Sequence, residues 1–225
     1  MALYINYNAI YIMTSVSNNR ILNIYKSRKT ILDLLYMQDY EVAEYKTFTI
    51  NEIDAMYSNS QLDMLVHNPT TQTKAYIHYY ISDTQTKQLR PNNLEKIIQD
   101  LFYIDTVLDK KDTLIIIIDE EPNDTLISKL NYTYNHSGIF VVVHNIKRLQ
   151  FNLLEHKLIP EVSILTEPEV EELKKTYNIR ELSQLPEISR YDPMALAMCM
   201  RPKQVCKLVR NSPTAMYYVY YRVCV

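Results

Sequence analysis

The chain has 225 residues, and its 24 lysines and arginines nearly balance its 26 aspartates and glutamates, so no overall charge attracts it to nucleic acid or to an anionic membrane. It has 20 tyrosines, no tryptophan and a single glycine, Gly138. Phosphate loops, dinucleotide fingerprints and nucleophile elbows all need several glycines, so this composition argues against the cofactor-dependent enzymes that use them. We expect no cofactor, and no membrane contact because no apolar run approaches the roughly 18 residues of a span.

The first 149 residues are predicted to form one α/β domain. The expected elements, in chain order, are a helix over 18–36 begun by Asn18 or Asn19, strands over 62–66 and 75–81, a helix over 94–107, a strand over 114–118, a helix over 124–130 and a strand over 139–143. Because the last three make a strand–helix–strand unit of apolar runs, they predict a parallel pair buried on both faces.

The first half of the first predicted helix is basic. Arg20, Lys26, Arg28 and Lys29 all lie in it. A solvated helix face is the simpler interpretation, and a face near a polyanion is the alternative.

Residues 150–225 are predicted to form a smaller α+β domain. Thr166 and Glu169 have the spacing of a capping box that begins a helix reaching about residue 177. Asp192 and Pro193 suit the start of another helix, since aspartate caps and proline fits the first helical position. Strands are expected over 204–209 and 217–224, joined by a turn near 211–213.

Acidic residues follow the strand predicted over 114–118. Asp119, Glu120 and Glu121 stand at its carboxyl end, where α/β folds place functional groups. Paired carboxylates there could hold magnesium for phosphodiester hydrolysis. The lysine that such nucleases carry on the next strand is missing, so the alternative is that these acids only solvate the strand end. The five histidines have no metal-binding spacing, and no metal site is predicted from them.

Charge is distributed unevenly over the C-terminal domain. No acidic residue follows Asp192, whereas five basic residues do: Arg201, Lys203, Lys207, Arg210 and Arg222. Such clustering near aromatic residues fits a nucleic-acid face, and it fits a docking surface for a protein of opposite charge equally well. The third alternative is that these exposed charges serve solubility alone. Cys199 and Cys206 lie in apolar runs and are expected to be buried, unreactive thiols.

Several motifs of residues 151–225 resemble one family in order and spacing. They are Glu155-His156-Lys157-Leu158-Ile159-Pro160, Gln184-Leu185-Pro186, Asp192-Pro193 with Ala195-Leu196, and a closing series of Val205, Lys207, Arg210, Ser212, Thr214, Tyr218, Tyr221 and Arg222. The family is the fifth subunit shared by the eukaryotic nuclear RNA polymerases, which has a counterpart in the archaeal polymerase. Residues 1–150 resemble its N-terminal domain in layout more than in sequence.

The chain departs from the family at three glycine positions, which are Cys199, Lys203 and Met216 here, so we expect the turns there to be built differently. Two of the four tyrosines at 217, 218, 220 and 221 match family positions. We therefore expect these tyrosines to pack in the fold rather than to stack on bases.

The resemblance implies an N-terminal jaw domain over 1–149, similar to an inactive restriction-endonuclease-like fold, and a C-terminal assembly domain over 150–225. It implies a non-catalytic polymerase subunit that docks on the largest subunit, contacts other polymerase subunits and lies near downstream double-stranded DNA. Pro122 and Asn123 would form a DNA-facing loop. The assembly signature would comprise Glu155, His156, Pro160, Asp192, Pro193, Arg201, Lys207, Arg210 and Arg222.

Two other functions are left open by the residues alone. One is a magnesium-dependent nuclease that uses Asp119 and Glu120, and the other is a free-standing DNA-binding module in residues 151–225. Heavy use of Ile, Asn, Lys and Tyr with almost no glycine indicates AT-rich coding. The source organism could then be a large DNA virus or an AT-rich protist. A viral protein would be located in a cytoplasmic viral factory or the virion, and a cellular protein in the nucleus.

Overall fold

The computed structural model describes residues 2–81, 88–212 and 214–225, with side chains described from Asn19 onward. Contacts divide the chain into two compact units, Met1–Phe151 and Asn152–Val225. Each unit combines helices with a mixed sheet, so the predicted α+β class is confirmed.

The N-terminal unit is built on a four-stranded sheet in the order β1-β2-β3-β4. The strands are β1 (Met64–Asn68), β2 (Thr73–Tyr80), β3 (Thr113–Ile118) and β4 (Phe140–Asn145). β1 is antiparallel to β2, and the other two pairings are parallel. Every residue of β3 and β4 is buried, which confirms the predicted parallel pair and follows from helices covering both faces.

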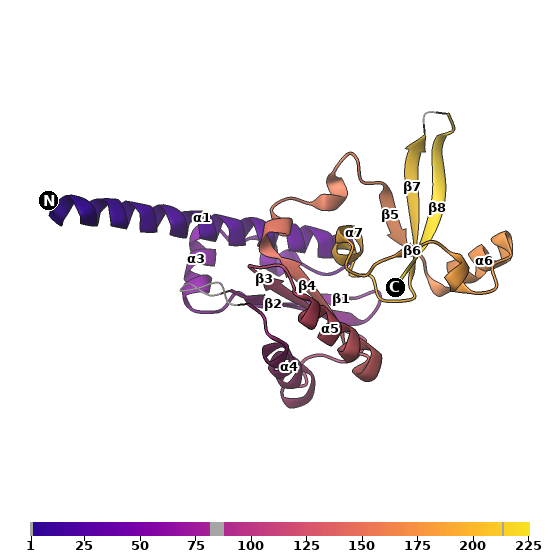
Figure 1. Cartoon of the computed structure of the whole chain (residues 1–225), viewed down its shortest axis with the longest axis horizontal. Helices are drawn as coiled ribbons and strands as arrows, with labels where there is room; N and C mark the ends of the chain where they lie inside the picture. Colours follow the sequence, from indigo (N-terminus) through magenta and orange to yellow (C-terminus); the bar gives the residue numbers. More distant parts are fainter. Residues whose placement is uncertain (1, 82–87, 213) are drawn as a thin grey trace. The chain divides into compact units, whose positions relative to one another are not determined.

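Helices flank this sheet, with α1 and α3 on one face and α4 and α5 on the other (Figure 1). The helices are α1 (Ala2–Tyr36), α2 (Ala43–Lys46), α3 (Ile50–Ser58), α4 (Pro91–Gln99), which continues as the π-helix η1 (Asp100–Ile104), α5 (Asp124–Ser137) and the 3-10 helix η2 (Ile146–Leu149). β3, α5 and β4 form the predicted strand–helix–strand unit.

Three predicted helix limits in this unit are wrong. α1 begins at Ala2, so neither Asn18 nor Asn19 starts it. The apolar stripe marks only the packed part of the helix, and among the side chains described from Asn19 onward the first buried one is Ile24. The helix predicted to reach residue 107 ends at Ile104, after α4 has continued as the π-helix η1. α5 runs on to Ser137 and stops at Gly138, whose φ of 71° is the left-handed conformation that glycine adopts without strain.

The C-terminal unit has a second four-stranded sheet, in the order β5-β7-β8-β6. Its elements are η3 (Leu153–Glu155), β5 (Glu161–Ile164), α6 (Glu167–Tyr177), η4 (Leu182–Gln184), β6 (Glu187–Ile188), α7 (Pro193–Ala197), β7 (Val205–Ser212) and β8 (Met216–Cys224). Pro213, in the predicted turn between the last two strands, lies outside the described residues.

The two faces of this second sheet carry separate apolar clusters. Cys206 and Leu208 pack with Ile188, Met200 and Cys224 on one face. Val205 and Val223 pack against Leu173 of α6 on the other face, as the alternation of side chains along strands requires.

Both predicted helix starts in the C-terminal unit are confirmed. Thr166 and Glu169 form the capping box of α6, with the Thr166 N–H donating to the Glu169 carboxylate at 2.7 Å. Asp192 caps α7, because its carboxylate accepts a hydrogen bond from the Met194 N–H at 2.9 Å and Pro193 follows at the first helical position.

The three turns at the family glycine positions adopt a glycine-like backbone. Cys199, Lys203 and Met216 have φ values of 49°, 74° and 58°, in the left-handed region that costs a residue with a Cβ roughly 1–2 kcal/mol. The expectation that these turns are built differently is therefore wrong. The chain instead accepts local strain at positions where glycine would have none.

Candidate functional site

The acidic strand end in the N-terminal unit is occupied by ion pairs. Asp119 lies 3.1 Å from the Arg20 guanidinium, and Glu121 accepts from the Nε of Arg148 at 3.0 Å. Burial raises the pKa of Asp119 in spite of the nearby charge of Arg20. Within the described residues no group of three His, Cys, Asp or Glu side chains could hold a metal ion. These contacts give the acids a structural role.

The predicted DNA-facing loop follows the same strand end. Asn123 uses its side-chain oxygen to accept from the Leu126 N–H at 2.9 Å, which caps α5. Pro122 is half-buried. The Asn123 side chain therefore holds the start of the helix, and a DNA contact by this loop stays a prediction.

The first residues of the predicted assembly signature shape local loops. Glu155 is exposed and accepts from the Asn152 amide at 3.0 Å, and the exposed His156 accepts from the Leu158 N–H through Nδ1 at 3.3 Å. Pro160 directly precedes β5. Arg201 is half-buried, and its backbone N–H donates to the Gln204 side chain at 2.7 Å. With Asp192 and Pro193 in the start of α7, these signature residues mainly define backbone geometry.

The β7–β8 hairpin extends beyond the strands that flank it (Figure 1). β5 pairs with β7 only over Cys206–Val209, and β6 pairs with β8 only at Val223 and Cys224. The part of the hairpin beyond these pairings is therefore open on both edges. We call the segment Met216–Tyr221 the hairpin edge.

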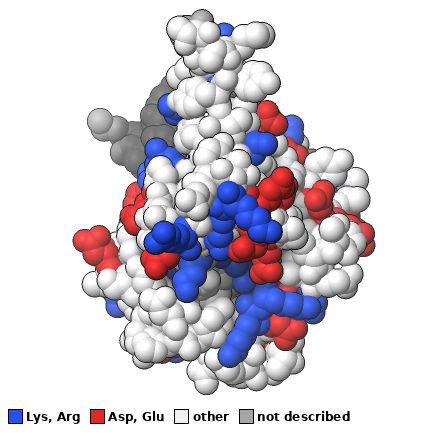
Figure 2. All heavy atoms as spheres, turned by 90° about the vertical axis from the view of Figure 1, so that its right-hand side faces the viewer, with Lys and Arg blue, Asp and Glu red and all other residues white. Residues whose placement is uncertain are grey.

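The hairpin edge is apolar, aromatic and exposed. Met216 is 82% exposed and Tyr217 62%, while Tyr218 and Val219 are 43% and 37% exposed. From Asn211 to Tyr221 the chain has no charged side chain, and Figure 2 shows the end of the hairpin as a largely uncharged projection. Strands of this kind normally carry charges or prolines that prevent edge pairing. Its composition is that of a surface that a protein partner covers.

Two backbone hydrogen bonds establish which groups of β8 face outward. The Cys224 N–H donates to Gln204, on the β7 side, whereas the Val223 N–H donates to Pro186, on the β6 side. Because N–H directions alternate along a strand, the N–H and C=O groups of Val219 and Tyr221 point to the open edge. Among the described residues neither N–H has a backbone partner there. An added strand would satisfy both.

One face of the hairpin carries a row of arginine and tyrosine side chains. The guanidinium groups of Arg210 and Arg222 lie 5.5 and 5.9 Å from the centre of the Tyr220 ring. Tyr218 stacks on Tyr220 with 5.5 Å between ring centres. Arg222 also donates to the Glu187 carbonyl at 2.9 Å. The row therefore holds two positive charges, those of Arg210 and Arg222, next to the Tyr220 ring.

Lys207 does not belong to that row, because it lies on the opposite face of β7. It lines a cavity of about 290 Å³ with Glu169, Glu172 and Tyr221. On the sequence alone Lys207 groups with Arg210, but their spacing along a strand places them on different faces. The structure brings together Arg210 and Arg222 only.

The expectation that the four closing tyrosines pack in the fold holds for two of them. Tyr220 and Tyr221 are half-buried against the two apolar clusters, whereas Tyr217 and Tyr218 are exposed, so for them the expectation is wrong. The sequence signal that could have found the exposed edge is the uncharged run itself. Cys206 is buried as expected, whereas the residue Cys199 is only half-buried. Desolvation raises the pKa of the Cys199 thiol to about 12 and that of Cys206 above its ordinary value.

The described helices include none with the length and apolar character required to cross a bilayer. The exposed apolar residues of β8 form a short strand edge bordered by arginines. Such a surface is suited to contact with another macromolecule. The geometry is consistent with a component of a larger assembly.

Comparison with known proteins identifies that assembly. Residues 151–224 match the family described as RNA polymerase Rpb5, C-terminal domain. The subunit Rpo5 of DNA-directed RNA polymerase from Thermococcus kodakarensis is 50% identical over 76 residues, which are 34% of this chain and 92% of the relative. The subunit rpabc1 of DNA-directed RNA polymerases I, II and III from Dictyostelium discoideum is 30% identical over 209 residues, 92% of this chain and 98% of the relative.

The chain therefore belongs to the family of the fifth subunit of DNA-directed RNA polymerases. It is a non-catalytic component of a polymerase, and its partners are other polymerase subunits. This membership, together with the ion-paired strand end, leaves no support for the magnesium-dependent nuclease.

Proposed function

We propose that the C-terminal unit docks on the largest subunit of a multisubunit DNA-directed RNA polymerase, and that the N-terminal unit forms part of the lower jaw beside downstream double-stranded DNA. The docking proposal rests on how much of an archaeal polymerase subunit is similar to this chain. The Thermococcus relative is matched over 92% of its own length by 76 residues of this chain, and the family model of the C-terminal domain matches residues 151–224. A module that makes up nearly a whole archaeal polymerase subunit contains what attachment to the polymerase requires.

The hairpin edge is the surface of this unit that is best suited to docking. Its outward N–H and C=O groups would pair with an extended segment of the partner, and its tyrosines would be covered by it. Arg210 and Arg222, beside Tyr220, favour acidic side chains near that segment. The expected partner surface is therefore an extended or edge strand with acidic residues at its ends.

A proline substitution at Val219 tests the edge without breaking the hairpin. The Val219 N–H points away from β7, so Val219→Pro removes a hydrogen-bond donor from the open edge and leaves the β7–β8 ladder intact. Val219→Ala is the matched control, because it removes the same side chain and keeps the N–H. We expect at least tenfold less largest subunit to co-purify with tagged Val219→Pro than with Val219→Ala. Equal recovery would refute docking through this edge.

The jaw placement rests on the loop that contains Pro122. Its neighbouring cations are largely neutralised, since Arg20 pairs with Asp119 and Arg148 with Glu121, so a DNA contact there would be local and would add few released counterions. In the assembled polymerase on template DNA, a photo-crosslinking side chain at position 122 should label the downstream duplex. The same group at the exposed Lys110, which precedes β3 at the other end of the sheet, is the control. Equal labelling from both positions, or none from position 122, would contradict the jaw placement.

A further inference from the structure

The four basic residues of the first helix have different environments. Lys26 and Lys29 are exposed, and Arg20 pairs with Asp119. Arg28 is only 3% exposed, so the simple interpretation of a solvated basic face is wrong for this residue. A buried guanidinium keeps its charge and is normally paired with an anion.

Arg28 has few hydrogen-bond partners. Its Nη1 donates to the Leu62 carbonyl at 2.8 Å, and its guanidinium lies 5.7 and 5.4 Å from the ring centres of Tyr45 and Phe48. Its Nε is buried and has no hydrogen-bond partner among the described residues. Burial lowers the pKa of Arg28 from its ordinary value. The side chain is held by a carbonyl and two rings, which do not neutralise a full positive charge.

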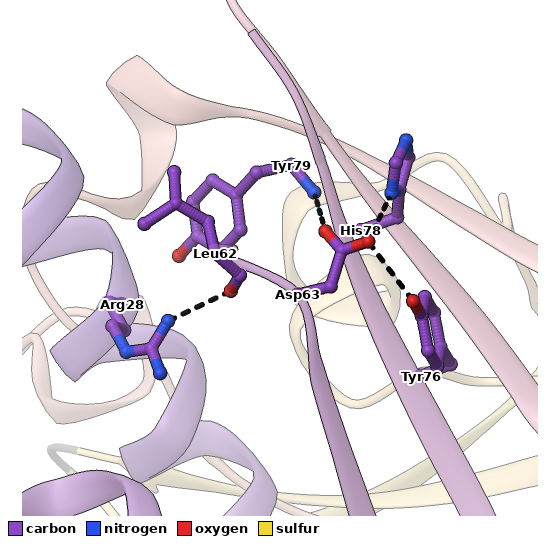
Figure 3. Close-up of polar contacts among 6 residues, drawn as sticks. All are labelled: Arg28, Leu62, Asp63, Tyr76, His78 and Tyr79. Atoms are coloured by element: carbon purple, nitrogen blue, oxygen red, sulfur yellow. Dashed lines mark hydrogen bonds and ion pairs between the residues drawn. The ribbon is translucent and has the colours of Figure 1, made fainter. Parts of the chain in front are cut away.

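Asp63, whose charge acts on Arg28, and Asp33, which lines the same cavity, are both engaged elsewhere. Figure 3 shows the Asp63 carboxylate turned away from Arg28, toward Tyr76, His78 and the backbone of Tyr79. Asp63 accepts from the Tyr76 hydroxyl at 3.0 Å, from the Tyr79 N–H at 3.1 Å, and lies 2.8 Å from Nδ1 of His78. Asp33 pairs with Lys46 at 3.3 Å. Among the described residues, Arg28 has no carboxylate within 4.0 Å.

A cavity of about 240 Å³ opens beside Arg28, and Lys29 and Lys46 line it together with Asp33, Tyr25 and Tyr45. At about 30 Å³ for each water, it has room for several waters or one small anion. Three cations and one carboxylate leave a net charge of +2 around it. A phosphate monoester or inorganic phosphate carries −1.5 to −2 near neutral pH, whereas a phosphodiester carries −1.

From this charge balance we propose that the cavity between α1, α2 and α3 is a binding site for a dianionic phosphate group. Arg28 would offer its guanidinium from the buried wall, and Lys29 and Lys46 would supply ammonium groups at the mouth. Guanidinium forks and lysine ammoniums are the side chains that proteins use for phosphate. The site is independent of the docking surface, since all of its residues lie in the N-terminal unit.

Phosphorus NMR of inorganic phosphate mixed with the purified full-length chain at constant ionic strength tests the site. The wild-type chain should broaden the phosphate resonance and Arg28→Lys should weaken binding at least tenfold, because a lysine loses the fork. Lys29→Gln should weaken it severalfold, and this exposed position keeps the test valid if Arg28→Lys does not fold. Lys26→Gln is the matched control, since it removes the same charge from an exposed position of α1 outside the cavity.

A second arm identifies the source of the phosphate. A short single-stranded oligonucleotide with a 5′-phosphate should displace inorganic phosphate better than the same oligonucleotide with a 5′-hydroxyl. No broadening by the wild-type chain, an equal effect of Lys26→Gln and Lys29→Gln, or equal displacement by the two oligonucleotides would overturn the proposal. None of these outcomes bears on whether the chain joins a polymerase.

Discussion

His144 makes the stability of the N-terminal unit depend on pH in a calculable way. It lies on β4, the edge strand that pairs with β3, with Ile117 as its neighbour in register, and it is nevertheless only 4% exposed. Burial lowers its pKa from 6.5 to about 4, with a smaller contribution from the charge of Arg148. Its Nε2 has no hydrogen-bond partner among the described residues, so nothing there stabilises the protonated ring.

The direction of the effect follows from proton uptake. Above pH 6.5 the ring is neutral in both folded and unfolded chains, and its contribution to stability is fully present. Between pH 6.5 and about 4 the unfolded chain binds a proton that the folded chain does not, so the free energy of unfolding falls as the pH falls. At about 1.4 kcal/mol for each tenfold change in proton affinity, the loss amounts to about 3 kcal/mol by pH 4.

The assay is urea unfolding of the full chain by circular dichroism between pH 7 and 4, for the wild type and for His144→Phe. Phenylalanine keeps an aromatic ring in the site and cannot be protonated. The difference in unfolding free energy between the two proteins should change by about 3 kcal/mol over this range, because other titrating groups cancel. A constant difference would refute the buried, neutral state of His144.

Three further predictions concern local features of the fold. Lys203→Gly should raise the unfolding free energy by up to about 1 kcal/mol, because glycine adopts the positive φ at this position without strain. Lys203→Ala keeps the Cβ, so equal stabilisation by both substitutions in urea unfolding would refute this explanation. Asn123→Ala should cost about 1 kcal/mol through loss of the α5 cap, and a change below about 0.3 kcal/mol in urea titration would show the cap to be dispensable. Burial disfavours the charged form of Asp63, but the hydrogen bonds that it accepts and the charge of His78 together outweigh burial and lower its pKa. This carboxylate therefore stabilises the fold at pH values above its unfolded pKa. The stabilisation is lost as the pH falls through its folded pKa. Asp63→Asn should lower thermal stability at neutral pH and reduce its dependence on acid, and an unchanged acid profile would argue against it.

The parts of the fold that were predictable are those that local physics determines. The apolar run at Leu114–Ile118 can be covered on both faces only in a layered fold. The capping box of α6 and the Asp-Pro start of α7 specify helix starts through a few adjacent atoms. The start of α1 was not predicted because the apolar stripe records tertiary contact rather than helix extent. The end of α5 was not predicted although Gly138 marks it.

The functional surfaces were less predictable because they depend on pairing. Whether a tyrosine on β8 is covered depends on how far β6 and β5 run along the hairpin, and short strands such as Glu187–Ile188 leave little trace in a sequence. The burial of Arg28 likewise depends on α2 and α3, which line the same cavity. We predicted neither helix, although Thr49 and Glu52 have the capping-box spacing that begins α3. Motif resemblance identified the family correctly but could not separate residues that shape loops, such as Asp192, from residues that face a partner, such as Arg210.

The most decisive measurement is quantitative purification of the tagged chain from its own cells or infected host, followed by mass spectrometry of the recovered proteins. We predict that the two large polymerase subunits are recovered in near-equal molar amounts with wild-type chain and with Val219→Ala, and are lost with Val219→Pro. Recovery of the tagged wild-type chain without any large polymerase subunit would contradict its role as a polymerase component.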